Sequence, residues 1–401
     1  MKTGTKYAII LPDGAADEPV AALGDRTPLE AAEIPHMHSI AETGRIGTVR
    51  TVPEGLTPGS DVATMSLFGY DPRKHYTGRA PIEAVARNLR LRPDDVVFRC
   101  NFVNVTGGEM TDFTAGHIRS AEAQAIIDEL NAKFSTEDLR FHAGVSYRNL
   151  LVLRDPTTLE VACMPPHDIP GEAVSEYLPK GKAAERIRRI MEEAEPIVTR
   201  HDVNQVRKDL GELPATAIWL WGQGLVPIMR RFRQRFGVRG AAIAAVDLIR
   251  GLAKLLGWTL IDVPGATGYL DTDYAAKGRA AVAALDEYDL VAVHIEAPDE
   301  AGHMGDAAAK VTALEQIDQH IVEPILEKLR GFPDWRILIA PDHPTPVNKR
   351  THTGDAPPFC MAGSDVERGP APAERFCEHS ARQSGLHIEE GHELMEYFLT
   401  R

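Results

Sequence analysis

Short apolar runs and longer stretches with helical periodicity alternate along most of the chain. The runs have the length of buried strands, and the stretches between them repeat their apolar positions every three to four residues. This alternation is typical of a parallel sheet covered by helices on both faces. The predicted strands are 7–11, 217–220, 241–246, 259–263, 290–295 and 337–340, and the clearest predicted helices are 275–285 and 310–329. We therefore predict an α/β fold with a doubly wound, mostly parallel sheet.

The middle of the chain has a different pattern. Between residues 76 and 172, short predicted strands at 96–102, 139–143, 149–153 and 160–163 surround one clear helix at 120–134. We interpret 76–172 as an inserted, smaller α+β domain, with 1–75 and 173–401 forming the two parts of the core. A charged amphipathic helix at 180–195 is expected to return the chain to that core with its charges in solvent.

Composition and charge exclude several classes of function. The 401 residues are 43% hydrophobic and 25% charged, enough for a sizeable core, and this length favours two structural units. Lys+Arg number 44 against 58 Asp+Glu, and the net charge of −14 disfavours nucleic-acid binding. No apolar run is long enough to span a membrane and no leader pattern opens the chain, so we expect a cytoplasmic protein. The oligomeric state is left open.

Candidate metal-binding residues follow the ends of the predicted strands. Asp13 follows the first strand, and Asp299 and His303 stand four residues apart after the strand at 290–295. One helical turn would bring that carboxylate and imidazole to the same face. The strand at 337–340 is followed in turn by Asp342, His343 and His352. Isolated residues of these types are commonly turn or surface residues, but two such clusters favour a metal site.

The ligand types narrow the metal and suggest a nucleophile. The four cysteines are scattered, so oxygen and nitrogen are the expected donors, and these suit Mn²⁺, Zn²⁺ or Mg²⁺. Ser60 follows a tight turn and precedes a helix-compatible stretch at 62–68, where it would be either an ordinary N-cap or a nucleophile. With Ser60 the candidate ligands number seven, about enough for two ions, and a two-metal site can activate a serine for phosphoryl transfer.

Several short motifs, spread along nearly the whole chain, resemble those of a known protein family. They are TPLEAA at 27–32, PGSD at 58–61, FGYDP at 68–72, YTGR at 76–79, FRCNF at 98–102 and GATG at 265–268. With the metal segments, they make the chain resemble the archaeal-type, cofactor-independent phosphoglycerate mutases of the alkaline phosphatase superfamily. The resemblance implies an alkaline-phosphatase-like fold, a small phosphorylated substrate, and no requirement for 2,3-bisphosphoglycerate.

The same resemblance assigns roles to the candidate residues. One divalent ion would be held by Asp13, Ser60, Asp342 and His343, and the other by Asp299, His303 and His352. Mn²⁺ is the expected ion, with Zn²⁺, Mg²⁺ or Co²⁺ as alternatives. Ser60 would accept the phosphoryl group from one hydroxyl of phosphoglycerate and return it to the other, while the inserted domain holds the glycerate.

Cationic partners for the anionic substrate are expected from the inserted domain. Arg99 and Arg148 are the candidates, because guanidinium groups match carboxylate and phosphate, although a surface ion pair explains either one. Two departures from the family leave open which alcohol accepts the phosphoryl group. Residues 112–117 contain no arginine, and Glu296 stands where a lysine is common. The alternatives are a homoserine kinase-like phosphotransferase, a phosphomonoesterase and a catalytically silent metal-binding protein.

Overall fold

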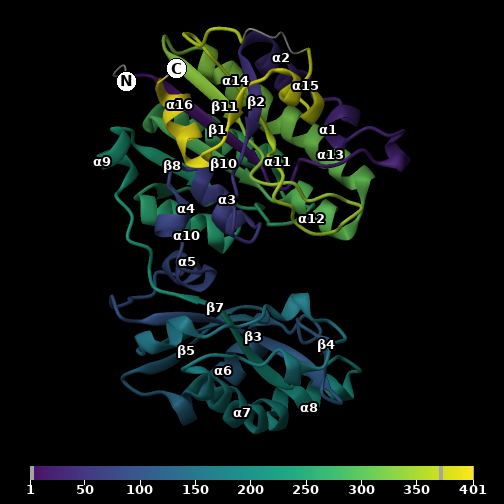
Figure 1. The fold of residues 1–401 in the computed structure, drawn as a ribbon, viewed down its shortest axis with the longest axis vertical. Helices are drawn as coiled ribbons and strands as arrows, with labels where there is room; N and C mark the ends of the chain where they lie inside the picture. Colours follow the sequence, from purple (N-terminus) through teal and green to yellow (C-terminus); the bar gives the residue numbers. More distant parts are fainter. Residues whose placement is uncertain (1–3, 370–373, 401) are drawn as a thin grey trace. The chain divides into compact units, whose positions relative to one another are not determined.

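The chain divides into two compact units. A computed structural model describes residues 4–369 and 374–400. The first unit comprises Met1–Tyr76 and Ile228–Arg401, and the second comprises Thr77–Pro227. The second unit therefore extends well beyond residue 172, which corrects the expected end of the inserted domain. Figure 1 shows the sheet and helices of each unit.

The first unit is built on a mostly parallel sheet. Among the described residues it has eight strands in the order β13-β2-β12-β11-β1-β10-β8-β9, in which β12 is antiparallel to both β11 and β2. The strands are β1 Lys6–Pro12, β2 Arg45–Val49, β8 Gly240–Ile243, β9 Thr259–Leu260, β10 Leu290–Ile295, β11 Trp335–Ile339, β12 Pro358–Gly363 and β13 His387–Ile388. The predicted α/β class is confirmed.

Helices cover both faces of this sheet. On one face, Ala8 and Ile10 of β1 pack against apolar side chains from α2, α11, α13 and α14. On the other, the ring of Tyr7 meets that of Phe398 in α16 at 5.7 Å. The helices are α1 Pro28–Ala31, α2 Pro35–Thr43, α3 Ser60–Leu67, α4 Pro72–His75, α9 Phe232–Phe236, α10 Asp247–Leu256, α11 Tyr274–Glu287, α12 Ala297–Met304, α13 Ala307–Ile317, α14 Glu323–Arg330, α15 Glu378–Gln383 and α16 Leu394–Thr400. The helix predicted at 310–329 is interrupted by a π-helical turn at Asp318–Val322.

The second unit is a five-stranded antiparallel sheet with helices on both faces, counted over the part of the chain that the structure describes. Its elements are α5 Arg79–Ala86, β3 Val96–Thr106, β4 Glu109–Asp112, α6 Ser120–Phe134, β5 Leu139–Val145, β6 Arg148–Leu153, α7 Ala184–Arg200, α8 Asp202–Asp209 and β7 Ala217–Gly224. Alternate residues of β3 point to opposite faces. Phe98 and Phe102 pack in the core that includes α6 and α7, and Val97 packs with α5 on the other face.

Three local expectations are wrong. The strand predicted at 217–220 belongs to the second unit, because β7 pairs with β3 and not with the large sheet. The helix predicted at 180–195 is α7, and its apolar side packs in the second unit's core instead of leading back to the first. The strand predicted at 160–163 is reduced to a single bridge between Ala162 and Lys180.

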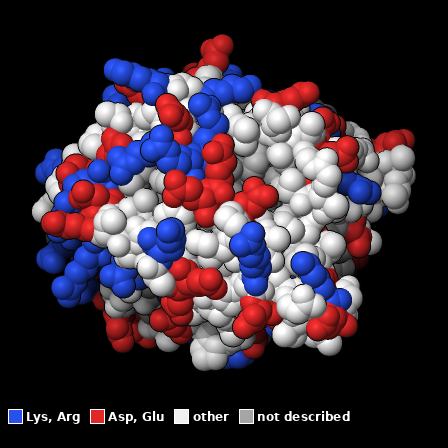
Figure 2. All heavy atoms as spheres, turned by 90° about the horizontal axis from the view of Figure 1, so that it is seen from below, with Lys and Arg blue, Asp and Glu red and all other residues white. Residues whose placement is uncertain are grey.

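Charges on the surface are mixed. On the face shown in Figure 2, basic side chains are interspersed with acidic ones. None of the helices in the described ranges is long and apolar enough to cross a membrane.

Candidate active site

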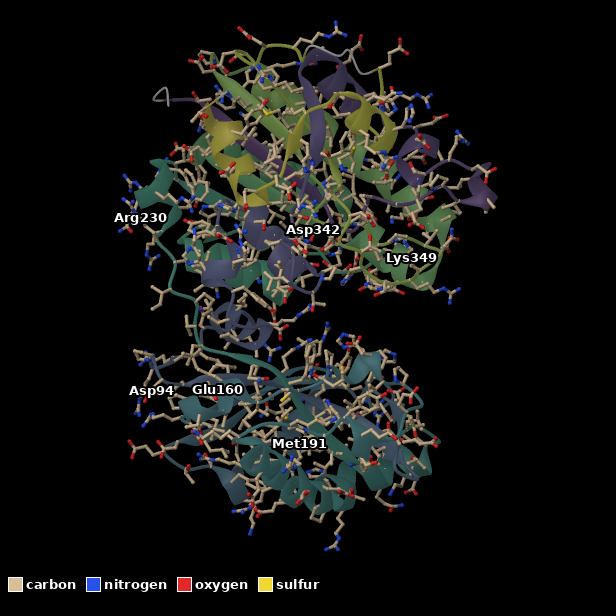
Figure 3. All side chains as sticks on the ribbon, in the orientation of Figure 1. Asp94, Glu160, Met191, Arg230, Asp342 and Lys349 are labelled. Carbon is tan, nitrogen blue, oxygen red and sulfur yellow. The ribbon has the colours of Figure 1, made fainter. Side chains whose placement is uncertain are left out.

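The carboxyl ends of three adjacent parallel strands bring the candidate ligands together. β1 lies between β11 and β10, with Ile10 opposite Ile339 and Pro12 opposite Ile295. Asp13 therefore leaves β1 beside the segments that follow the other two strands, as expected for the site edge of an α/β sheet. Asp342, which follows β11, is fully buried, and Figure 3 shows it inside the first unit while Lys349 lies near the surface.

Helices α12 and α3 present the remaining candidates. Pro298 lies in the first turn of α12 and a left-handed Gly305 ends the helix, so Asp299 and His303 share one face. The carboxylate of Asp299 lies 3.2 Å from His303 Nε2, which confirms the predicted one-turn pairing. Ser60 lies at the N-terminus of α3, as predicted, but it is the first helical residue and Gly59 is the N-cap; Ser60 is 8% exposed.

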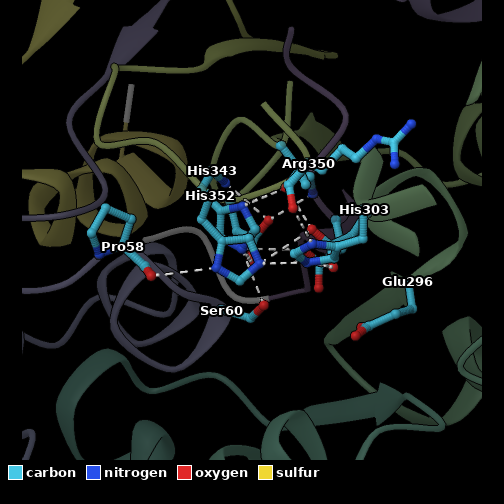
Figure 4. Close-up of polar contacts among 12 residues, drawn as sticks. Pro58, Ser60, Glu296, His303, His343, Arg350 and His352 are labelled. Atoms are coloured by element: carbon cyan, nitrogen blue, oxygen red, sulfur yellow. Dashed lines mark hydrogen bonds and ion pairs between the residues drawn. The ribbon is translucent and has the colours of Figure 1, made fainter. Parts of the chain in front are cut away.

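The side chains converge as Figure 4 shows. Ser60 Oγ lies 3.1 Å from His343 Nε2, which is 3.5 Å from Asp13 Oδ1 and 3.6 Å from Asp342 Oδ2. His352 Nε2 lies 3.0 Å from His303 Nε2 and 3.5 Å from Asp299 Oδ1. All seven candidates of the first unit, Asp13, Ser60, Asp299, His303, Asp342, His343 and His352, thus form one connected cluster.

The donor set fits divalent cations. In the described residues, Asp299, His343 and His352 form one group whose ligand atoms lie within 4.8 Å of one another, and Asp13, Asp342 and His343 form another. Asp13 Oδ1 is buried without a hydrogen-bond partner. Burial of a carboxylate oxygen costs free energy unless a donor or a cation binds it. Oxygen and imidazole donors without sulfur suit Mn²⁺, Zn²⁺ or Mg²⁺.

Electrostatics reinforce this interpretation. Burial, followed by the charges of Asp342 and Glu296, raises the pKa of Asp13 well above its usual range. Burial likewise raises the pKa of Glu296 to about 8, with repulsion from Asp299 as the next cause. Burial would also raise the pKa of Asp299, but its hydrogen bonds with His303 and His352 outweigh that effect and lower it. The cluster therefore holds more negative charge than its own residues compensate, which favours cation binding.

Sequence reasoning missed His294 as a neighbour of the cluster and noted Glu296 only as a departure from the family. His294 in β10 is 2% exposed, and its Nε2 lies 2.8 Å from Asp13 Oδ2. This bond occupies one oxygen of Asp13 and leaves Oδ1 for a metal. Glu296 and His294 form a third ligand group with Asp13. The available signal was a lone imidazole inside an otherwise apolar strand, which is seldom buried without a polar partner.

The two candidate arginines lie in the second unit on one face of its sheet. One face of the sheet carries the side chains of residues 97, 99 and 101 in β3 and of residues 148, 150 and 152 in β6. On this face, Val97 and Leu150 pack against α5. Arg99 is 6% exposed, pairs with Glu83 of α5 at 3.2 Å and stacks on Trp221 at 4.6 Å. Arg148 is exposed.

Glu83 is the centre of an arginine cluster that sequence reasoning did not identify. It is 4% exposed, and Arg79 lies one turn away at 3.3 Å. Burial would raise the pKa of Glu83, but the charges of Arg99 and Arg79, with smaller effects of Arg87 and Arg148, lower it. Two guanidinium groups thus pair with this carboxylate and two more act on it through their charge, and the excess positive charge suits an anionic ligand.

Comparisons with known proteins agree with one another, and the relatives match nearly the whole chain. A family model described as 2,3-bisphosphoglycerate-independent phosphoglycerate mutase matches residues 41–204. A relative from Methanothrix thermoacetophila that carries this name is 50% identical over 395 residues, covering 98% of this chain and 99% of the relative. One from Geobacter sulfurreducens, named a probable enzyme of this type, is 45% identical, covering 99% of this chain and 100% of the relative.

Two solved structures are also similar. A protein from Pyrococcus horikoshii is 28% identical with a TM-score of 0.83, covering 99% of this chain and 97% of that one. The cofactor-independent phosphoglycerate mutase from Thermoplasma acidophilum is 26% identical with a TM-score of 0.65, covering 98% of this chain and 99% of that one.

Proposed function

The chain belongs to the 2,3-bisphosphoglycerate-independent phosphoglycerate mutase family, and from that premise we propose that it interconverts 3-phosphoglycerate and 2-phosphoglycerate. The observation that supports this most directly is the convergence of Ser60 with six carboxylate and imidazole ligands at one sheet edge. A serine beside such ligands is suited to accept and return a phosphoryl group.

Two groups of residues would hold two divalent ions, with Mn²⁺ the expected species and Zn²⁺, Mg²⁺ or Co²⁺ the alternatives. When bound, such ions lower the pKa of a neighbouring hydroxyl and neutralise charge on a phosphoryl group. No 2,3-bisphosphoglycerate would be required. One group is Asp13, Ser60, Asp342 and His343, and the other is Asp299, His303 and His352.

Ser60 carries the group transfer in this proposal. Its Oγ attacks the phosphorus of 3-phosphoglycerate, the bond from phosphorus to the C3 oxygen breaks, and phosphoserine forms. The proton lost by Ser60 balances the proton gained by the C3 oxygen. The C2 hydroxyl then attacks the phosphoserine, its proton returns to Ser60 Oγ, and 2-phosphoglycerate leaves. Ser60 also lies at the start of α3, and the backbone N–H groups of a helix N-terminus suit an anionic phosphoryl group.

The arginine cluster of the second unit would bind the anionic glycerate. Arg148 is exposed and available for direct contact, whereas Arg99 is buried against Glu83 and would act mainly through its charge. Replacement of Arg148 with Met is expected to raise the KM for 3-phosphoglycerate more than it lowers kcat, because ground-state binding is lost.

A coupled assay tests the proposed function. The Mn²⁺-loaded protein is incubated with 3-phosphoglycerate, and 2-phosphoglycerate is detected through enolase. Ser60→Ala is expected to reduce turnover to background and to abolish the phosphoserine seen by mass spectrometry. Ser66→Ala is the matched control, because Ser66 lies on the same helix, is 1% exposed and has no hydrogen-bond partner for its hydroxyl.

Three outcomes would contradict the proposal. They are no 2-phosphoglycerate at high enzyme concentration, release of inorganic phosphate without isomerisation, and transfer of phosphate from ATP to homoserine in a parallel reaction. The second outcome would indicate a phosphomonoesterase. The third would indicate a homoserine kinase-like enzyme.

A further inference from the structure

Thr345 lies between the two groups of ligands. It follows His343 by two residues and is fully buried. Its hydroxyl donates a hydrogen bond to Asp299 Oδ1 and lies 3.2 Å from Nδ1 of His343, and the proposed function assigns these two ligands to different ions. A single side-chain atom therefore contacts both groups of the proposed metal site.

The chemistry of a hydroxyl determines what this contact does. Thr345 has one proton, and an ionised carboxylate such as that of Asp299 can only accept it. The hydroxyl must then accept from His343, so the imidazole carries its proton on Nδ1. The Nε2 lone pair is left facing Ser60 Oγ, 3.1 Å away. Partners of this kind set the tautomer and orientation of metal-binding imidazoles.

Lys310 holds the backbone of Thr345 in place. Its ammonium group is fully buried and donates to Thr345 O at 2.9 Å, Asp17 Oδ2 at 2.7 Å and Ala16 O at 3.3 Å. The segment after β11 is thereby tied to the segment after β1, which begins with Asp13. Lys310 itself lies on α13, directly after the helix that carries Asp299 and His303. Lys310 thus bonds to two of the ligand-bearing segments and closely follows a third, α12, along the chain.

Thr345 packs closely against two glycines, Gly302 in α12 and Gly14 in the turn after β1. A Cβ on Gly302 would lie 2.3 Å from Thr345 O, and one on Gly14 would lie 2.6 Å from Thr345 Oγ1. Real Cβ atoms do not approach so closely, so only glycine is compatible with this packing. The hydroxyl has little freedom to move away from its two partners.

We propose that Thr345, held by Lys310, is a positioning residue that sets the two groups of metal ligands in register. The proposal rests on the proposed function for the identity of the ligands. It assigns Thr345 no contact with substrate and no part in bond making. Its effect would be exerted through the orientation of Asp299 and His343.

Metal binding to the purified protein measures this effect directly. We expect Thr345→Val to weaken Mn²⁺ binding, followed by isothermal titration calorimetry, by roughly 10- to 100-fold, as found when partners of metal ligands are removed. Thr345→Ser keeps the hydroxyl and is expected to restore binding to within a few-fold of the native protein. At saturating Mn²⁺, Thr345→Val should lower kcat while the KM for 3-phosphoglycerate changes little.

The control is another buried threonine far from the ligands. Thr158 is fully buried in the second unit, and its hydroxyl donates to Asp155 O at 2.7 Å. Thr158→Val removes a comparable hydrogen bond and should leave the Mn²⁺ dissociation constant unchanged. A merely structural role for Thr345 would make the two variants alike in metal binding.

Lys310→Met provides a second measurement in case Thr345→Val fails to fold. It is expected to weaken Mn²⁺ binding, whereas Arg207→Met, which removes a buried cation from the second unit, should not. Native Mn²⁺ affinity in both Thr345→Val and Lys310→Met would overturn the inference even if the protein is a mutase. A protein that binds Mn²⁺ normally but lacks mutase activity would overturn the proposed function alone, and the binding comparison would still decide the role of Thr345.

Discussion

Replacement of Gly14 with alanine should damage the site more than any comparable glycine substitution. Gly14 follows Asp13 in a left-handed conformation with φ of 62°, and its N–H donates to Asp342 Oδ1 at 3.1 Å. A Cβ there would lie 2.6 Å from Asp299 Oδ1 and 2.7 Å from the Asp299 Cα atom. Either the loop or α12 must move, and both carry candidate ligands.

The magnitude has two parts. A left-handed conformation costs an L-residue roughly 1–2 kcal/mol. Crowding in a packed interior adds roughly 1–3 kcal/mol. Gly24→Ala separates these parts, because Gly24 also has a left-handed φ, of 69°, but no atom lies within 4 Å of its would-be Cβ. We expect Gly14→Ala to lower the free energy of unfolding by about 2–5 kcal/mol and Gly24→Ala by about 1–2 kcal/mol.

Urea denaturation of the metal-free variants measures the difference, and Mn²⁺ titration reports on the site. Gly14→Ala should also bind Mn²⁺ more weakly than Gly24→Ala. Equal unfolding free energies for the two variants, together with native Mn²⁺ affinity in Gly14→Ala, would refute the packing argument.

Three further predictions concern stability. Burial, with a smaller effect of the Arg375 charge, lowers the pKa of His38 to about 4, and its Nδ1 accepts the N–H of Phe376 at 3.1 Å. The contribution of neutral His38 to the free energy of unfolding is therefore complete above the unfolded pKa of about 6.5 and is lost as the pH falls toward 4. His38→Asn should flatten the pH dependence of the free energy of unfolding between these two pH values. The check is urea denaturation at several pH values, and parallel curves would contradict the assignment. Arg207 is 1% exposed and bonds to Glu122, so Arg207→Met should cost roughly 3–5 kcal/mol in urea denaturation, and a loss below 1 kcal/mol would count against a buried ion pair. Removal of metal with EDTA should lower the free energy of unfolding by about 2.7 kcal/mol for each site at which the free metal concentration had been 100 times the dissociation constant. Calorimetric scans unaffected by EDTA would argue against a metal site.

Local sequence patterns were sufficient for five strands of the large sheet and for most of the site, whereas β2, β12 and β13 were not predicted. β1 and β10 are continuous apolar runs with chemistry-bearing residues directly after them, and such runs need no knowledge of their partners to be identified. The four-residue spacing of Asp299 and His303 likewise determines a shared helix face. The ligand types alone, oxygen and imidazole without sulfur, limited the class of metal.

Strand pairing and distant contacts required the tertiary structure. The run 217–220 is apolar in either sheet, and only its pairing with β3 shows that β7 belongs to the second unit. Thr345 looks like an ordinary residue of a Pro-Thr-Pro segment until Asp299 and His343 are placed around it. Lys310 would be expected on a solvated helix surface, yet it is buried among carbonyl groups from two other segments. By itself the sequence determined which residues could do the chemistry and which strand ends present them. Their partners were decided by contacts between distant segments, such as Gly14 and Asp342, which are 328 positions apart, and no local periodicity records such contacts.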